Sequence, residues 1–146
     1  MSERVEKAVE IFGPENCNCS QAVAVAFSDA VGMEQAMAMS VARGFGGGIG
    51  RFGLTCGAVT GALMILGLKV TQIEPDEKKA KAKAYELAGE FRKKFESRHG
   101  TMDCKSLVGI DLSTEEGQKV NDEKKITRNL CPDFVRTASE ILDDIV

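Results

Sequence analysis

Residues 44–68 decide the fold of this chain: GFGGGIGRFG (44–53) runs directly into LTCGAVTGALMILGL (54–68). Six of the ten residues in 44–53 are glycine, and glycine loses more backbone entropy on ordering than any other residue, so this run predicts a loop. The 15 residues that follow are apolar but fewer than the ~20 that span a bilayer. They predict a central buried helix from about Thr55 to Gly67.

Apolar residues also recur at helical spacing on both sides of this segment, and no stretch alternates clearly enough to predict a strand. The chain is therefore expected to be all-α: one domain over residues 1–146, a helical bundle of about six to seven helices with the glycine-rich loop before the central helix. Besides 55–67, helices are expected over residues 3–12, 19–31, 34–43 and 75–98, after an N-cap at Ser113, and over 132–144.

Composition excludes several classes of function. A net charge of −3 with no Trp disfavours nucleic-acid binding, which needs a basic surface. Residues 1–7 hold no apolar signal core, and no stretch is long enough to insert in a membrane, which predicts a cytoplasmic protein.

The methionines at 33, 37 and 39 would suit a homodimer interface.

The five cysteines, Cys17, Cys19, Cys56, Cys104 and Cys131, are the main candidates for chemistry. An odd number argues against a closed set of disulfides. Cys19 and Cys56 stand at predicted helix starts, and Cys131 precedes Pro132, a residue favoured in the first helical position. The positive end of a helix dipole lowers the pKa of a thiol, and the thiolate is both nucleophile and metal ligand. Buried, inert cysteines are the alternative.

The glycines allow two interpretations. The pattern G-x-G-x-x-G at 48, 50 and 53 is not a dinucleotide site, because no strand precedes it. The loop either wraps closely around Cys56 or presents N–H groups to an anion or cofactor, and the candidate contacts are Gly47, Gly48, Gly50 and Gly57. Gly53, Gly57 and Gly61 are spaced four apart and would share one face of a helix. That face would either allow tight packing against another helix or leave space for a ligand beside Cys56.

Two other polar residues each allow a functional interpretation. Arg51 either pairs with an anion or thiolate or is an ordinary surface arginine. His99, the one histidine, is expected to be solvated in a loop that leads to Cys104.

The segments NCSQAV (18–23), GGGIG (46–50) and TCGAVTGA (55–62), followed by isolated Cys104 and Cys131, resemble the family of redox-active proteins named for the pattern C_GCAxxG_C_C. The resemblance covers nearly the whole chain. It implies four characteristic cysteines at Cys19, Cys56, Cys104 and Cys131, a redox function, and an association with transporters. Cys17 is then an extra cysteine whose role is open.

Two redox mechanisms follow, and an oxidoreductase is the enzyme class they favour. In the first, Cys56 attacks a disulfide or oxidant and Cys19 resolves the product, with an unidentified redox partner. In the second, Cys19, Cys56, Cys104 and Cys131 hold an iron–sulfur cluster or another thiolate-bound metal. A different class is a non-enzymatic helical binding module that docks on a transporter or binds a small anion at the glycine-rich loop.

Overall fold

The computed structural model describes residues 2–13 and 15–146, and over these residues the chain forms eight α-helices, two short 3₁₀ helices and no strand. The predicted all-α class is confirmed; a single domain over 1–146 stays a prediction. The helices are α1 (Glu3–Ile11), α2 (Cys19–Phe27), η1 (Ser28–Val31), α3 (Gln35–Val41), η2 (Arg43–Phe45), α4 (Gly57–Ile73), α5 (Glu77–His99), α6 (Cys104–Val108), α7 (Glu115–Lys124) and α8 (Ile126–Ile145).

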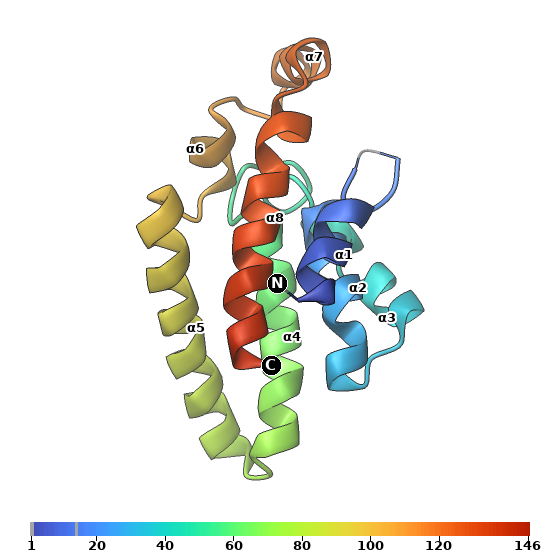
Figure 1. Ribbon diagram of the computed structural model, residues 1–146. Helices are drawn as coiled ribbons and strands as arrows, with labels where there is room; N and C mark the ends of the chain where they lie inside the picture. Colours follow the sequence, from blue (N-terminus) through green and yellow to red (C-terminus); the bar gives the residue numbers. More distant parts are fainter. Residues whose placement is uncertain (1, 14) are drawn as a thin grey trace.

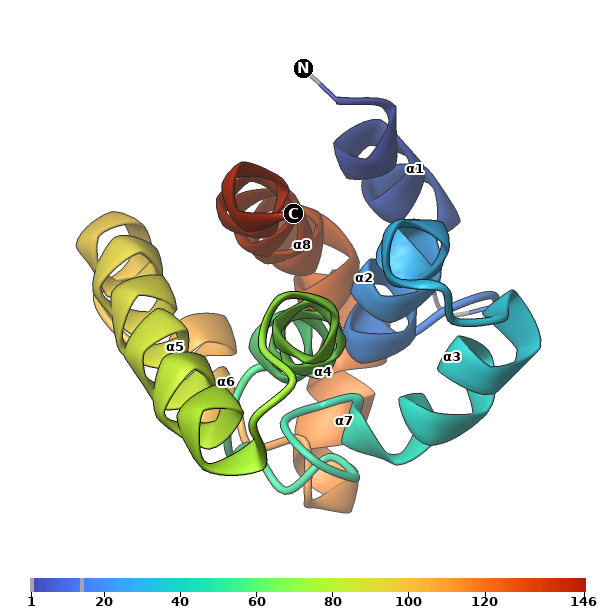
Figure 2. The same ribbon diagram turned by 90° about the horizontal axis from the view of Figure 1, so that it is seen from below.

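The apolar helix α4 is the centre of the bundle, with α2, α5 and α8 packed around it (Figures 1 and 2). Helix α4 packs closely against α2 because glycines of α4 leave no side chain between the two helices. A Cβ on Gly57 would overlap the Cys19 Sγ, and one on Gly61 would lie 2.5 Å from the Ser20 carbonyl oxygen. Tight helix packing is therefore confirmed for these two glycines. Gly53 precedes the helix with φ +75° and does not share that face.

The start of α8 differs most from the sequence prediction. The helix begins at Ile126, so Pro132 and Cys131 lie inside it rather than at its first turn. The reason is a side chain from α7: the Asn121 Oδ1 accepts a hydrogen bond from the Thr127 N–H at 2.9 Å. This bond satisfies one of the free N–H groups of the first turn, which lets the helix begin before the proline.

Smaller differences concern helix ends. The turn expected after Cys104 is the short helix α6, capped by Asp103, whose side chain accepts from the Ser106 N–H at 3.0 Å. Thr114, not Ser113, is the N-cap of α7 and accepts from the Gly117 N–H.

None of the helices described in residues 2–13 and 15–146 combines the length and apolarity that a membrane span requires. Of the three methionines near α3, Met33 and Met39 pack against the core and Met37 is exposed. The homodimer stays a prediction.

Candidate functional site

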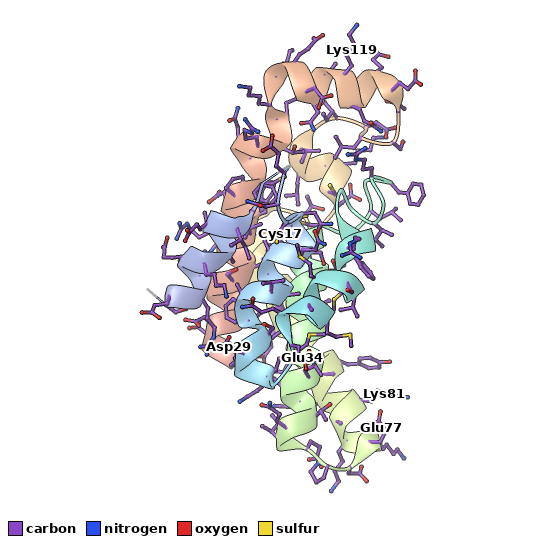
Figure 3. All side chains as sticks on the ribbon, turned by 90° about the vertical axis from the view of Figure 1, so that its right-hand side faces the viewer. Cys17, Asp29, Glu34, Glu77, Lys81 and Lys119 are labelled. Atoms are coloured by element: carbon purple, nitrogen blue, oxygen red, sulfur yellow. The ribbon has the colours of Figure 1, made fainter. Side chains whose placement is uncertain are left out.

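The glycine loop and the starts of α2, α4 and α8 line a cavity of about 650 Å³. In Figure 1 these segments lie at the end of the bundle nearer α6 and α7. All five cysteines line the cavity. Figure 3 shows Cys17 at the end of α2 nearer α7, opposite Asp29. The fold thus brings together residues that lie up to 114 positions apart, Cys17 and Cys131. Each is buried, with 4% to 9% of its surface exposed.

Cys19 and Cys56 occupy the starts of two helices, as the sequence predicted. Cys19 is the first residue of α2, behind a capping box in which the Asn18 Oδ1 accepts from the Gln21 N–H at 2.9 Å. Cys56 is the N-cap of α4. Because Gly57 has no side chain, the Cys19 Sγ fits against the first turn of α4. Two positive helix ends therefore meet at one pair of thiols.

The two thiols of this pair have opposite pKa shifts. A hydrogen bond from the Cys56 thiol is the largest effect on Cys19; it outweighs burial and lowers the pKa of Cys19 from 9.0 to about 7. Backbone N–H groups of Gly47, Ser20 and Cys19 itself also lower it. The pKa of Cys56 is raised well above its ordinary value by the same bond, by burial and by the charge on Cys19. Backbone N–H groups at the start of α2 and in the glycine loop lower the pKa of Cys19 and so favour the charge on this thiol.

Cys104 is brought to the cavity by pairing between the segments before Cys56 and before Cys104. The Cys56 N–H donates to the Met102 carbonyl at 2.8 Å, and the Cys104 N–H donates to the Leu54 carbonyl at 2.6 Å. A Cβ on Gly48 would lie 2.6 Å from the Cys104 Cβ, so this glycine makes room for Cys104. Burial, followed by the charge on Cys19, raises the pKa of Cys104 to about 12.

Cys131 reaches the cavity from inside α8 and not from a helix start, so the helix-dipole argument made for it was wrong. Burial, followed by the charge on Cys19, raises its pKa. Cys17, whose role the sequence left open, lies 3.7 Å from the Met39 Sδ, to which its thiol donates, and burial raises its pKa. Both are neutral thiols near pH 7.

The glycine loop forms a left-handed turn in which five successive residues, 47–51, have φ between 55° and 69°. The N–H groups of residues 49–54 donate to carbonyls of residues 44–49 at 2.9–3.2 Å, so these N–H groups are not available to an anion. Gly47 and Gly50 line the cavity, whereas Gly48 and Gly57 lie behind Cys104 and Cys19. The four glycines thus surround the cysteines; a cofactor role for them stays a prediction.

His99 is not solvated, contrary to expectation. It lies half-buried between the rings of Phe95 and Phe134, with the Nε2 2.9 Å from the Thr137 Oγ1. Burial lowers its pKa. Its partner Phe134 lines the cavity, so His99 supports the cavity wall from behind.

A thiolate-bound metal ion needs several ligand side chains close to one point. In residues 2–13 and 15–146, no three His, Cys, Asp or Glu side chains are grouped closely enough to hold one metal ion. The cysteines share a cavity, but in this arrangement they do not fit a single thiolate-bound ion. A ligand role for Cys19, Cys56, Cys104 and Cys131 in a larger cluster stays a prediction.

Sequence reasoning missed two arginines of the site, Arg43 and Arg128, which line the cavity together with Arg51. They come from η2, the glycine loop and α8. No spacing in the sequence connects these three elements, so only the fold could reveal the group.

Comparisons with known proteins found one family match. Neither the search of curated proteins nor the search of solved structures found a match. One family model matches residues 17–145, which include all five cysteines, the glycine-rich loop and the glycines at the start of α4. The chain therefore belongs to the family described as "Putative redox-active protein (C_GCAxxG_C_C)".

Proposed function

We propose that this protein is a thiol–disulfide redox protein in which Cys19 and Cys56 cycle between dithiol and disulfide. The observation that carries the proposal is the packing of the Cys19 Sγ against the first turn of α4, whose N-cap is Cys56, together with a pKa of Cys19 lowered to about 7. About half of such a thiol is ionised at pH 7, against about 1% at a pKa of 9, and the thiolate is the attacking species.

Within the pair, Cys19 is the attacking residue and Cys56 the resolving one, the reverse of the sequence-based assignment. The sequence placed both at helix starts, a feature that does not by itself distinguish the attacking cysteine from the resolving one. The ranking rests on the backbone donors: Gly47, Ser20 and Cys19 itself supply N–H groups to the Cys19 sulfur. The Cys56 thiol keeps its proton and donates it to that sulfur.

The oxidant in the proposed reaction is a disulfide, RSSR. The Cys19 thiolate attacks one sulfur, so that a Cys19–SR bond forms, the S–S bond breaks and one RS⁻ leaves. The Cys56 thiol then loses its proton to the departing thiolate or to solvent and attacks the Cys19 sulfur, which releases the second RS⁻. The protein dithiol loses two electrons and the disulfide gains two.

The competing binding-module hypothesis has less support. Its anion site was to be formed by the N–H groups of the glycine loop, and those of residues 49–54 are bonded within the loop. An association with a transporter stays a prediction.

A single-turnover experiment tests the proposal. Reduced protein mixed with hydroxyethyl disulfide should release two mercaptoethanol molecules per chain. Cys56→Ser should release one and keep a mixed disulfide on Cys19, and Cys19→Ser should release none. Cys17→Ser, altered in the same cavity, should behave as wild type. Release by Cys19→Ser at the wild-type rate would contradict the proposal.

Iron and acid-labile sulfide, measured in protein purified without oxygen, separate the cluster hypothesis from the thiol one. Stoichiometric iron and sulfide that disappear in Cys104→Ser would favour a cluster, because Cys104 has no part in the thiol–disulfide step. A colourless, metal-free protein that completes the single turnover would favour the thiol pair.

A further inference from the structure

We propose that the substrate of this cavity is a small anionic disulfide, one that carries a carboxylate on each half. The inference rests on the proposed function and adds the chemical class of the substrate. It is drawn from the arginines around the cavity, which differ from the other arginines of the chain.

The chain has seven arginines. The four that lie away from the cavity each pair with a carboxylate at 2.7–3.1 Å: Arg4 with Asp29, Arg92 with Glu96, Arg98 with Glu140, and Arg136 with Glu6. The three that line the cavity, Arg43, Arg51 and Arg128, make no ion pair with any residue in 2–13 and 15–146. Among the arginines, the three without an ion-pair partner in the described residues are thus the three at the cavity.

The charge balance of the lining is the opposite of the charge balance of the chain. Asp122 is the one acidic residue among the described lining residues, which with three arginines gives a net +2, whereas the chain carries −3. A cleft lined by one sign of charge concentrates ligands of the other sign. The Cys19 thiolate would repel an anion, and the three arginines more than offset that single charge.

Arg51 is held toward the cavity by an unusual backbone. Its φ is +69°, a conformation that L side chains rarely adopt, and the Nη1 donates to the Gln118 Oε1 of α7 at 3.3 Å. A Cβ on Gly47 would lie 2.8 Å from the Arg51 Cα, so the turn needs glycine at that position. Strained residues of this kind persist where the surrounding structure requires them, often at functional sites.

Depth and size favour a small molecule over a protein disulfide. The arginines are exposed, whereas Cys19 and Cys56 are 7% and 4% exposed, so the charges surround the entrance and the thiols lie below. A volume of about 650 Å³ is in the range of small-molecule sites. A disulfide of two short carboxylic acids could place its S–S bond at Cys19 while its carboxylates meet guanidinium groups, which bind carboxylates in a bidentate manner.

The reaction is the two-step exchange given above, with each leaving thiolate carrying a carboxylate. The Cys19 thiolate attacks, the first thiol acid leaves, the Cys56 sulfur forms the Cys19–Cys56 disulfide, and the second thiol acid leaves. One disulfide is reduced to two thiols while the protein dithiol is oxidised. Charge therefore selects the substrate, and the cysteine pair transfers the electrons.

Three simple disulfides of different charge test this: dithiodiglycolate (dianion), hydroxyethyl disulfide (neutral) and cystamine (dication). Each single-turnover rate is divided by the rate of the same probe with free dithiothreitol, which removes intrinsic reactivity. We expect the wild type to prefer the dianion over the neutral probe by about tenfold at low salt, and the neutral over the dication, since hydrogen bonds to charged groups have about this strength. Arg51→Gln and Arg128→Gln should each reduce the dianion-to-neutral ratio about threefold, and the control Arg92→Gln should leave it unchanged.

The outcomes separate the two proposals. Equal normalised rates for all three probes would overturn the charge inference and leave the thiol–disulfide function standing. No reaction with any probe would overturn the proposed function. Calorimetry on the Cys19→Ser/Cys56→Ser protein, which cannot react, then tests the substrate class alone: dithiodiglycolate should bind and cystamine should not, and equal or absent binding of both would refute it.

Discussion

Replacing Cys56 by alanine removes the hydrogen bond that contributes most to the low pKa of Cys19. The pKa of about 7 lies about two units below the ordinary 9.0, which corresponds to about 3 kcal/mol. Without the Cys56 thiol, burial still raises the pKa and the backbone N–H groups still lower it. We therefore expect the pKa of Cys19 to return to about 9.

The expected change in reactivity follows from two opposing effects. At pH 7 the ionised fraction of Cys19 would fall from about one half to about 1%, a factor of about 50. A thiolate of higher pKa is intrinsically more nucleophilic, and a Brønsted slope of about 0.45 over two units returns a factor of about eight. The labelling rate at pH 7 should thus fall about sixfold in Cys56→Ala, whereas at pH 10 the variant should react faster than wild type.

The assay is iodoacetamide labelling of reduced protein over a range of pH, with the Cys19 peptide quantified by mass spectrometry. Cys17→Ala is the matched control, because Cys17 lies in the same cavity but has no part in lowering the pKa of Cys19; its midpoint should stay near pH 7. A wild-type midpoint near 9, or a midpoint that does not move in Cys56→Ala, would refute the reasoning.

Three further outcomes are expected. Gly57→Ala should destabilise the fold by about 1–3 kcal/mol in urea denaturation, because the added methyl group overlaps the Cys19 sulfur. Gly67→Ala is the control in the same helix: nothing lies within 4 Å of it, so the change should be neutral or stabilise by up to about 1 kcal/mol. Equal effects of the two substitutions would contradict the close packing of α4 against Cys19. Asn18→Ala removes the cap of α2 and should cost about 1 kcal/mol, a loss that exposed Ser40→Ala should not reproduce. Under reducing conditions, the free energy of unfolding should rise between pH 7 and 9, because unfolded Cys19 keeps a proton that folded Cys19 has lost. The Cys19→Ala variant should not show this rise. An equal rise in the variant would mean that other groups cause it.

The central elements of the fold could be predicted because their signals are local. Helix α4 is a continuous apolar stretch behind a glycine run, and Asn18 marks the start of α2 as a capping box with Gln21. Local signals of this kind placed Cys19 and Cys56 at helix starts, where the structure has them.

The rest of the site depends on contacts between distant segments. The Asn121 side chain of α7 accepts a hydrogen bond from the Thr127 N–H in the first turn of α8, and this helix begins before Pro132, so a rule that places proline in the first turn put Cys131 at the wrong position. Cys104 reaches the cavity through three backbone hydrogen bonds between its own segment and the segment that leads into α4, too short a pairing to appear as strand alternation. The arginines converge only once three elements are folded together, and the ranking of Cys19 above Cys56 needs N–H groups from the glycine loop.

Disulfide mapping tests the central claim most directly. Reduced protein is equilibrated in glutathione buffers of increasing potential, trapped with acid and alkylation, and digested for mass spectrometry. The account predicts that a Cys19–Cys56 disulfide is the first to form, while Cys104 and Cys131 remain alkylated as free thiols. First oxidation at another pair, or no disulfide between Cys19 and Cys56 at any potential, would contradict it.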